Sequence, residues 1–404
     1  MKVLQKAAIH QLYWAAHKAN LFPKSSPAQY FYDFDCLLDR LGILKQYFPK
    51  GVLHAVAIKT QSNSAVLQKI VDNGMGLEAA SIEEVHLALA TGIEASKIVF
   101  DSPVKTREEI DFCHQQLPGI YVNANSLEEL KRYPPDFSGR LGLRINPLVR
   151  SDAPSIFDVA QKRSKFGVPI DQEAAIIQAS IDYPIKGLHL HIGSGIRNFS
   201  GNIEAIGRVL KLAHKINQLR PDNPLEFLDI GGGIDFEAAT GSTFSVASFV
   251  DVLIKQYPTM FEDFQLITEF GKFVHKHNAF AVSTIEYVTP PQQASEAGTA
   301  FIHIGADLFL RKVYSKLSIN YPCSVHCPQK KPSSSTLKYN IAGPLCFAGD
   351  FLYYDLVLPK LQSGDLFFMH QVGANTLSLW SNHCSRTAPY FVGFYASRLI
   401  SSLT

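Results

Sequence analysis

The stretch His54-Ala55-Val56-Ala57-Ile58-Lys59-Thr60 has the composition of a buried β-strand, yet it ends on a lysine. Its small and β-branched apolar residues suit a strand of a parallel sheet that is covered on both faces. A lysine at the carboxyl end of such a strand would lie at the edge where α/β folds place their chemistry. The plainer interpretation is a lysine whose ammonium group reaches solvent past the strand end. The rest of the chain decides between the two.

Short strand-like runs alternate with helical patterns after this stretch. The strand-like runs cover residues 54–59, 76–80, 97–101, 120–123, 141–146, 187–192, 227–230 and 266–269. The helical patterns cover residues 64–72, 82–91, 106–115, 126–132, 172–181, 202–219 and 243–256. Such alternation predicts βαβ units and a parallel sheet. About eight repeats match a closed (β/α)₈ barrel, the TIM barrel, better than an open sheet.

The alternative is an open Rossmann-type sheet. Its phosphate-binding glycines belong after the first strand. Here the glycine cluster Gly231-Gly232-Gly233 follows the seventh strand-like run. This position disfavours the open sheet.

The pattern changes after Lys272, where strand-like runs follow one another without long helices between them. They cover residues 282–289, 300–305, 337–341, 352–358, 365–371 and 390–394. This arrangement predicts an antiparallel β domain, with an exposed loop over 322–335. We therefore expect an N-terminal segment over 1–28 that packs on the β domain, a barrel over 29–274 and the β domain over 275–404.

Composition restricts the possible partners. The chain has 404 residues, 46% of them hydrophobic, and a net charge of +2, so no basic surface indicates nucleic acid or an anionic membrane. No apolar run approaches the length of a membrane span, and residues 1–20 lack the unbroken apolar core of a secretory signal. A cytoplasmic protein is the expectation.

The six cysteines do not form a disulfide framework in a chain of this length. Cys323, His326 and Cys327 lie close together in sequence, but no second cysteine pair follows at zinc-site spacing. We therefore expect no metal site.

Polar residues stand at the ends of the predicted barrel strands, where they would converge on one site. In chain order they are Lys59, Glu78, Asp101, Asn123, Arg144, His191 with Ser194, the glycines 231–233, and Glu269. Glycines leave backbone N–H groups free to approach a phosphate, although a tight turn explains a triple glycine equally well. An imidazole could lie flat on an aromatic ring, and a buried carboxylate could hold a pyridinium N–H. Taken singly, His191 could be a core histidine and Glu269 could pair with Arg144. Together, the residues suit a phosphorylated cofactor.

Seven motifs in order give the chain a resemblance to a known family. They are Ala55-Val56-Ala57-Ile58-Lys59, Gly76-Leu77-Glu78-Ala79-Ala80-Ser81, Ser164-Lys165-Phe166-Gly167, His189-Leu190-His191-Ile192-Gly193-Ser194, Leu228-Asp229-Ile230-Gly231-Gly232-Gly233, Gly343-Pro344-Leu345-Cys346 and Gly373-Ala374-Asn375. Across nearly its whole length the chain resembles the fold-type III pyridoxal-phosphate decarboxylases, the ornithine/arginine and diaminopimelate decarboxylase group. That group combines a barrel with a β domain, as the alanine racemases also do.

The resemblance implies pyridoxal 5'-phosphate (PLP) as cofactor and a role for each matching residue. Lys59 matches the lysine to which the cofactor is attached, His191 the imidazole stacked on its ring, and Glu269 the acid on its ring nitrogen. The other cofactor contacts that it implies are Glu78, Arg144, Ser194, Gly232, Gly233, Gly271 and, from the β domain, Asn375. Cys346 matches a catalytic cysteine sent into the site by a second subunit, which implies a head-to-tail homodimer with shared active sites.

Departures from the family pattern bear on the amino-acid substrate. Phe347 stands where an acidic residue recognises a distal amino group, and Lys272 stands where an arginine holds a distal carboxylate. Asn375 replaces a tyrosine, while Arg311 and Tyr314 approximate the family's substrate-binding arginine and tyrosine. We therefore expect decarboxylation of a bulkier or modified amino acid, with Lys272, Arg311, Tyr314 and Phe347 in the substrate pocket. The alternatives are an amino-acid racemase and a decarboxylase-like regulator without catalysis.

Overall fold

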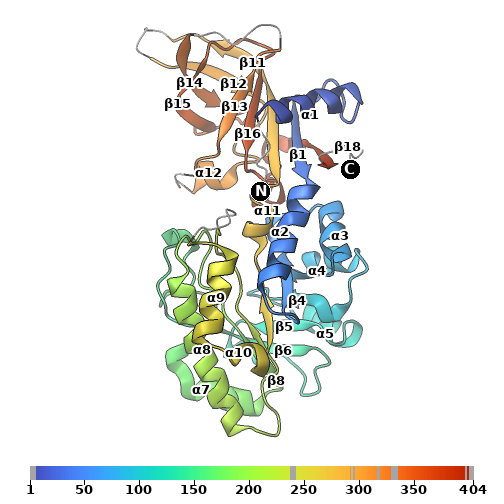
Figure 1. Cartoon of the computed structure of the whole chain (residues 1–404), viewed down its shortest axis with the longest axis vertical. Coiled ribbons are helices and arrows are strands. Elements are labelled where there is room, and N and C mark those ends of the chain that lie inside the picture. The colour runs from blue at the N-terminus through green and yellow to red at the C-terminus, as the bar shows by residue number, and fades with distance from the viewer. Residues whose placement is uncertain are drawn as a thin grey trace. The chain divides into compact units, whose positions relative to one another are not determined.

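The computed structural model describes residues 6–236, 243–291, 293, 296–315, 319–328, 335–395 and 398–399. The chain divides into two compact units, labelled by element in Figure 1. The barrel unit is Leu38–Val274, and the β unit combines Met1–Leu37 with His275–Thr404.

Eight parallel strands form the barrel unit: β2 (Leu53–Ala57), β3 (Gly76–Ala79), β4 (Ile98–Phe100), β5 (Tyr121–Ala124), β6 (Arg140–Asn146), β8 (Ile185–His189), β9 (Phe227–Asp229) and β10 (Gln265–Thr268). They pair in the order β5-β4-β3-β2-β10-β9-β8-β6, and pairing of β5 with β6 closes the ring. The short strand β7 (Val168–Pro169) pairs with β6. The predicted (β/α)₈ barrel is confirmed, and the open Rossmann-type alternative is wrong.

Helices surround these strands (Figure 1). They are α2 (Phe34–Tyr47), α3 (Ser64–Asp72), α4 (Ile82–Leu89), α5 (Arg107–Gln116), α6 (Leu127–Leu130), α7 (Glu173–Asp182), α8 (Ser200–Leu219), α9 (Val246–Gln256), α10 (Met260–Asp263) and α11 (Gly271–His275). Single 3₁₀ turns lie at η1 (Ile58–Thr60), η2 (Ala95–Lys97), η3 (Ser155–Phe157) and η4 (Ile170–Gln172).

Side-chain caps begin several of these helices directly after a strand. The Ser81 hydroxyl accepts the backbone N–H of Glu84 at the start of α4, and the Ser126 hydroxyl accepts that of Glu129 at the start of α6. Each cap satisfies a backbone donor that the first helical turn leaves free. The short capped connections fix where the strand-end residues lie.

The barrel interior is filled with side chains. Ala55, Val99, Tyr121, Phe227 and Ile267 form a buried cluster contributed by five different strands. The rings of Tyr121 and Phe227 pack edge to face, with 4.9 Å between their centroids. A Cβ on Gly187 of β8 would lie only 2.5 Å from the Phe227 ring, so this large residue requires a small neighbour. At the level of this cluster the barrel is a packed core and not a pore.

The β unit contains a curled nine-stranded sheet. Its strands are β1 (Ala28–Asp33), β11 (Ala279–Thr289), β12 (Gly298–Ile302), β13 (Cys323–His326), β14 (Thr336–Ala342), β15 (Phe351–Pro359), β16 (Leu366–His370), β17 (Tyr390–Tyr395) and β18 (Arg398–Leu399). Short helical segments are α12 (Leu310–Tyr314), η5 (Leu377–Leu379) and η6 (His383–Ser385). The pairings are antiparallel, as predicted, except for the parallel pairs β1–β17 and β12–β14.

Strand β1 corrects the predicted start of the barrel at residue 29. It pairs with β11 on one side and with β17 on the other, so it lies inside the sheet of the β unit. Tyr30, Phe31 and Tyr32 are all fully buried because the sheet is covered on both faces at this point. In sequence β1 runs straight into helix α2, which is why it resembled the first element of the barrel.

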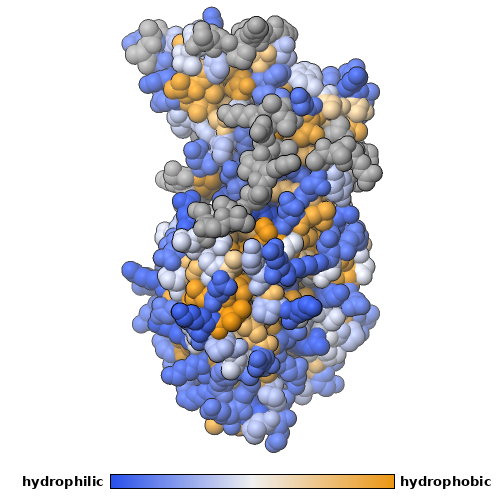
Figure 2. Space-filling view, in the orientation of Figure 1, coloured by the Kyte–Doolittle hydropathy of each residue, from blue (hydrophilic) through white to orange (hydrophobic). Residues whose placement is uncertain are grey.

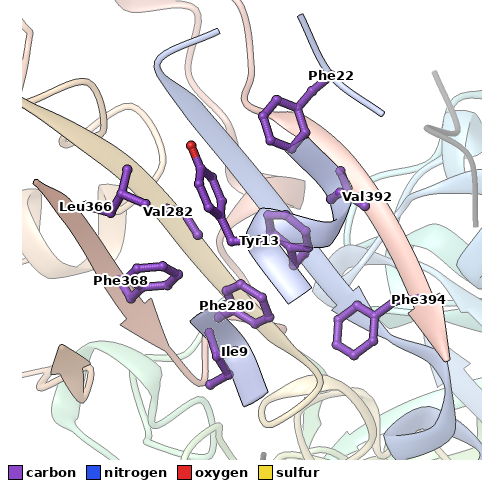
Figure 3. Close-up of a cluster of buried hydrophobic side chains, with 11 residues drawn as sticks. Ile9, Tyr13, Phe22, Phe280, Val282, Leu366, Phe368, Val392 and Phe394 are labelled. Atoms are coloured by element: carbon purple, nitrogen blue, oxygen red, sulfur yellow. The ribbon is translucent and has the colours of Figure 1, made fainter. Parts of the chain in front are cut away.

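The helix α1 (Lys6–Lys18) packs on this sheet (Figure 3). Its apolar residues Ile9 and Tyr13 lie in one buried cluster with Phe280 of β11, Phe368 of β16 and Val392 of β17. The segment predicted over 1–28 thus contains a helix that covers one face of the sheet.

The predicted exposed loop over residues 322–335 is wrong at its start. Residues Cys323–His326 form β13, which pairs with β16. The proline, lysine and serine residues that suggested a loop fall mostly on 329–334, which lie outside the described residues.

None of the helices in the described part of the chain is long and apolar enough to cross a membrane. The longest of them, α8, has 20 residues but carries Arg208, Lys211 and Lys215 along its length.

Candidate active site

Polar side chains converge at the carboxyl ends of the barrel strands. The first of them differs from its predicted place: β2 ends at Ala57, and Lys59 lies in the 3₁₀ turn η1 that follows. Glu78 lies within β3, whereas Asp101 and Glu269 are the first residues after β4 and β10. Because the strands are parallel and the barrel is closed, these positions share one end of the barrel.

Lys59 is held by Glu78. Its Nζ donates to both carboxylate oxygens of Glu78 at 2.6 Å. The Glu78 side chain is fully buried, while that of Lys59 is 43% exposed and is therefore accessible from the mouth. Burial acts to lower the pKa of Lys59, but the carboxylates of Glu78, Asp101 and Glu269 outweigh it and raise this pKa. Burial raises the pKa of Glu78, with Asp101 adding to the effect.

Arg144 forms its ion pair with Asp101. Nη1 of Arg144 lies 3.6 Å from Oδ2 of Asp101, and the guanidinium lies over the Phe166 ring at 4.5 Å. Burial opposes ionisation of Asp101, but the nearby Lys59 and a hydrogen bond with Glu78 lower its pKa. The alternative that Glu269 merely pairs with Arg144 finds no support, because among the described residues Arg144 forms its ion pair with Asp101.

Glu269 is a buried carboxylate that shares a hydrogen bond with the carboxyl group of Asp229. Both of its oxygens are inaccessible to solvent, and neither accepts a hydrogen bond from an N–H group of the described residues. Its charged or titratable neighbours include His189, with Nε2 at 3.7 Å, His191, with Nδ1 at 3.6 Å, and the carboxyl group of Asp229. Burial and the charge of Asp101 raise the pKa of Glu269 to about 7. Such a group is ready to receive a cationic N–H donor.

His191 is neutral and fixed in orientation. Its Nδ1 accepts the backbone N–H of Gly232 at 3.2 Å, which places the remaining ring proton on Nε2. Burial, together with the positive charges of Arg144 and Lys59, lowers the pKa of His191 to about 3. An uncharged imidazole offers a flat face for stacking.

Two glycine segments approach each other closely beside His191. Gly231, Gly233 and Gly195 have positive φ angles of +64°, +87° and +82°. A Cβ on Gly232 would overlap the carbonyl oxygen of Glu269, and one on Gly233 would overlap that of Gly193. Glycine is therefore required at this close approach, which we call the glycine nest. The N–H groups of Gly231, Gly232 and Gly195 are donated within the protein, to Asp229, His191 and the carbonyl oxygen of Gly233.

The other predicted barrel residues border this nest. Ser194 lies between Gly193 and Gly195 and donates its backbone N–H to Phe157. A Cβ on Gly271 would lie 2.6 Å from Oγ1 of Thr60, so this position is also crowded. Nζ of Lys272 pairs with Oδ2 of Asp235 at 3.2 Å. It also lies 3.1 Å from where a Cβ of Gly195 would stand, so Lys272 adjoins the nest.

The remaining predicted residues lie in the β unit. The rings of Tyr314, at the end of α12, and Phe347 stack at 5.2 Å with an interplanar angle of 9°. The His383 ring also stacks on Phe347, with 6.4 Å between ring centroids. Arg311 is a partly buried residue of α12, and Cys346, next to Phe347, has an exposed side chain. Asn375 has φ +56°, a left-handed conformation that asparagine adopts more readily than a tyrosine.

Residues 38–276 match the family model described as "Pyridoxal-dependent decarboxylase, pyridoxal binding domain". The chain belongs to this decarboxylase family. The match covers the whole barrel unit, and it confirms the resemblance found in the sequence motifs. Like its relatives, this decarboxylase is a PLP-dependent carboxy-lyase that acts on an amino acid.

Curated relatives extend the similarity over most of the chain. The decarboxylase is 26% identical to diaminopimelate decarboxylase of Helicobacter pylori, over 91% of this chain and 90% of the relative. It is 27% identical to diaminopimelate decarboxylase of Campylobacter jejuni, over 88% of each chain.

Solved structures show the same fold. The H. pylori diaminopimelate decarboxylase complexed with L-lysine has a TM-score of 0.82 at 24% identity, with 95% of each chain covered. The Paramecium bursaria Chlorella virus arginine decarboxylase bound to agmatine has a TM-score of 0.80 at 18% identity, over 97% of this chain and 100% of that one.

The barrel mouth of the decarboxylase fits PLP on the evidence of its own geometry. The buried carboxylate of Glu269, which accepts no N–H donor of the described residues, suits a protonated ring nitrogen. The neutral imidazole of His191 and the accessible Nζ of Lys59 complete the set.

Sequence reasoning gave no role to three buried residues at this mouth. Asp101 was noted at a strand end but not assigned, although it pairs with Arg144. His189 stands two residues before His191, and Asp229 accepts the backbone N–H of Gly231 at 3.0 Å. Both lie inside the motifs His189-Leu190-His191 and Leu228-Asp229-Ile230-Gly231. Their place next to predicted site residues is the sequence feature that could have indicated a role.

Proposed function

We propose that the decarboxylase attaches PLP to Lys59 and acts, as a head-to-tail homodimer, on an amino acid bulkier than ornithine or diaminopimelate. We infer this substrate class from the stacking of the Phe347 ring on Tyr314, with His383 also stacked on Phe347. An aromatic group here offers no carboxylate to a distal ammonium group. The structures of relatives include complexes with L-lysine, agmatine and putrescine, which all end in a cationic group.

When bound, PLP supplies an electron sink for the pair released as the carboxylate leaves the substrate. The residues of this chain bind and orient it. Lys59 must be neutral to react with an aldehyde, and Glu78 is placed to accept its proton across their 2.6 Å contacts. Its raised pKa makes Glu78 an effective acceptor.

Glu269 and His191 act on the ring of the cofactor in this proposal. The buried carboxylate of Glu269 would hold a protonated ring nitrogen, and the neutral imidazole of His191 would offer its flat face to the ring. By the family resemblance, Ser194, Gly232, Gly233, Gly271 and Asn375 would hold the phosphate. Arg144 forms an ion pair with Asp101 and so favours the ionised form of this carboxylate near Lys59.

Cys346 of a second copy would deliver the proton that replaces the carboxylate. The Cys346 side chain is exposed in this chain, as such a role requires. Apolar side chains are also exposed on β14 and β15: Leu337, Tyr354 and Val357 are 43%, 64% and 59% exposed. Figure 2 shows hydrophobic surface on this part of the β unit. Exposed apolar groups of this kind mark interaction surfaces, and a second copy would cover them. A cytoplasmic location stays a prediction.

The substrate is tested by carbon dioxide release from a panel of amino acids that includes N-acylated and citryl-type derivatives. Lys59→Ala is the blank, and it should also lose the visible absorbance that borohydride removes from wild type. Full activity on ornithine or meso-diaminopimelate would refute the proposed substrate class. Chiral analysis of the recovered amino acid excludes or reveals racemisation.

The shared active site is tested by mixing two inactive variants, Lys59→Ala and Cys346→Ala. In a head-to-tail dimer each mixed pair contains one site with both lesions and one with neither. Random exchange at equal amounts should therefore restore about a quarter of wild-type activity, because half of the dimers are mixed. No recovery after verified subunit exchange would contradict the shared site.

A further inference from the structure

His189 is a second imidazole at the barrel mouth, deeper than His191. It is the last residue of β8, and its spacing of two residues from His191 places both side chains on the same side of an extended chain. The His189 side chain is fully buried, whereas that of His191 is 19% exposed. The mechanism proposed above uses His191 and leaves His189 without a role.

One ring nitrogen of His189 faces two carboxylates. Its Nε2 lies 3.7 Å from Oε1 of Glu269 and 3.9 Å from Oδ2 of Asp101. Neither ring nitrogen has a hydrogen-bond partner within the described parts of the chain. A buried polar group in this state is costly, so a fully buried imidazole at this place calls for a function.

The imidazole of His189 is neutral. Burial lowers its pKa well below the usual value, and the nearby charge of Arg144 acts in the same direction. A neutral ring carries a single N–H, and the two carboxyl groups next to Nε2 only accept when they are ionised, so their ionised forms favour the tautomer protonated on Nε2. The titratable and charged groups that surround His189 and Glu269 are Lys59, Glu78, Asp101, Arg144, His191 and Asp229.

A metal ion would be the other use of these side chains. Asp101, His189 and Glu269 each offer a ligand atom, and the three atoms lie within 4.8 Å of one another. However, Arg144 lies 3.6 Å from Asp101 and Lys59 adds a second positive charge to the cluster, so a divalent cation would be repelled. A neutral N–H donor suits this charge pattern better.

We propose that His189 is a positioning residue for Glu269, with its Nε2–H directed between the carboxylates of Glu269 and Asp101, which share this donor at 3.7 and 3.9 Å, beyond hydrogen-bond length. The shared donor holds the Glu269 carboxylate in one orientation and favours its ionised form, which is the form that can keep a ring nitrogen protonated. This inference rests on the role given to Glu269 in the proposed function. Loss of the donor makes Glu269 easier to protonate, so activity fails at a higher pH.

Three substitutions of His189 in the holoenzyme test the inference. His189→Leu keeps an apolar volume without a donor, His189→Gln places an amide nitrogen near the position of Nε2, and His189→Asn is one methylene too short to reach it. His275→Gln is the control, because His275 is also a fully buried imidazole but contacts the Tyr32 hydroxyl. For each variant, kcat/KM is measured across pH together with the visible absorbance of the bound cofactor.

We expect His189→Leu to move the acidic limb of kcat/KM upward by about one pH unit, which corresponds to about 1.4 kcal/mol of lost interaction with the ionised carboxylate. His189→Gln should restore the acidic limb of wild type. His189→Asn should behave like His189→Leu, and the control His275→Gln should behave like wild type. A uniform loss of activity at every pH in His189→Leu, or equal rescue by Asn and Gln, would overturn the inference. A wild type that holds no cofactor and releases no carbon dioxide would instead overturn the proposed function itself.

Discussion

Replacing Gly233 with alanine tests the close approach of the two glycine segments at the barrel mouth. Gly233 has φ +87°, which costs a residue with a Cβ about 1–2 kcal/mol, and that Cβ would overlap the carbonyl oxygen of Gly193. Relief of the overlap would separate the segments and break the hydrogen bonds that Gly195 and Ile196 donate to the Gly233 carbonyl at 2.9 and 3.1 Å. Each such bond contributes about 1 kcal/mol, so we expect a loss of about 3–4 kcal/mol in the free energy of unfolding.

Gly51→Ala is the matched control, because Gly51 has φ +94° and no atom within 4 Å of the added Cβ. It should lose only the conformational part, about 1 kcal/mol after the lower entropy of the unfolded alanine chain is counted. Urea unfolding measures both variants, and absorbance titration measures PLP affinity, which should fall at least about tenfold in Gly233→Ala alone. Equal stability of the two variants with unchanged PLP affinity would refute the reasoning.

Three further changes have expected outcomes. Phe347→Asp should raise carbon dioxide release from ornithine relative to wild type, because it supplies a carboxylate for the distal ammonium group; no gain on any diamino acid would count against the proposed role of Phe347. Lys105→Met should lower the free energy of unfolding by about 3–5 kcal/mol, because Nζ of Lys105 is fully buried and donates to Glu129 and two carbonyl groups. Urea unfolding measures this loss and should show little change in the control Lys131→Met, whose side chain is exposed. Burial lowers the pKa of His275 to about 3, so below about pH 6.5 the unfolded chain takes up a proton that the folded chain does not. Stability should therefore fall by about 2 kcal/mol between pH 7 and pH 5 on account of His275, and His275→Gln should remove this part of the decline in urea unfolding at the two pH values.

Local patterns were sufficient to predict the barrel and the residues around its mouth. The strands from β2 to β10 are short apolar runs between amphipathic helices, and the polar residue that ends a run marks the mouth whatever the details of packing. Lys59 illustrates the limit, because its 3₁₀ turn follows from the backbone geometry after Ala57 and not from composition.

Features that depend on distant partners could not be predicted. The place of β1 is decided by pairing with β11 and β17, whose residues lie far along the chain. The roles of Asp101 and His189 likewise depend on which side chains the closed barrel brings within 4 Å of them. A sequence pattern reports burial along one strand but not the identity of the neighbours across the barrel.

The pairing of β1 with β17 has a consequence for the order in which the protein forms during synthesis. The barrel unit is one continuous segment, so it can fold as soon as the ribosome has released it. Strand β1, which contains Tyr30, Phe31 and Tyr32, has both of its neighbouring strands only after residues 390–394 have been synthesised. Until then, an apolar strand edge is open to pairing with other nascent chains. Chaperone binding or pausing of translation would matter most in this interval, between completion of the barrel and release of β17.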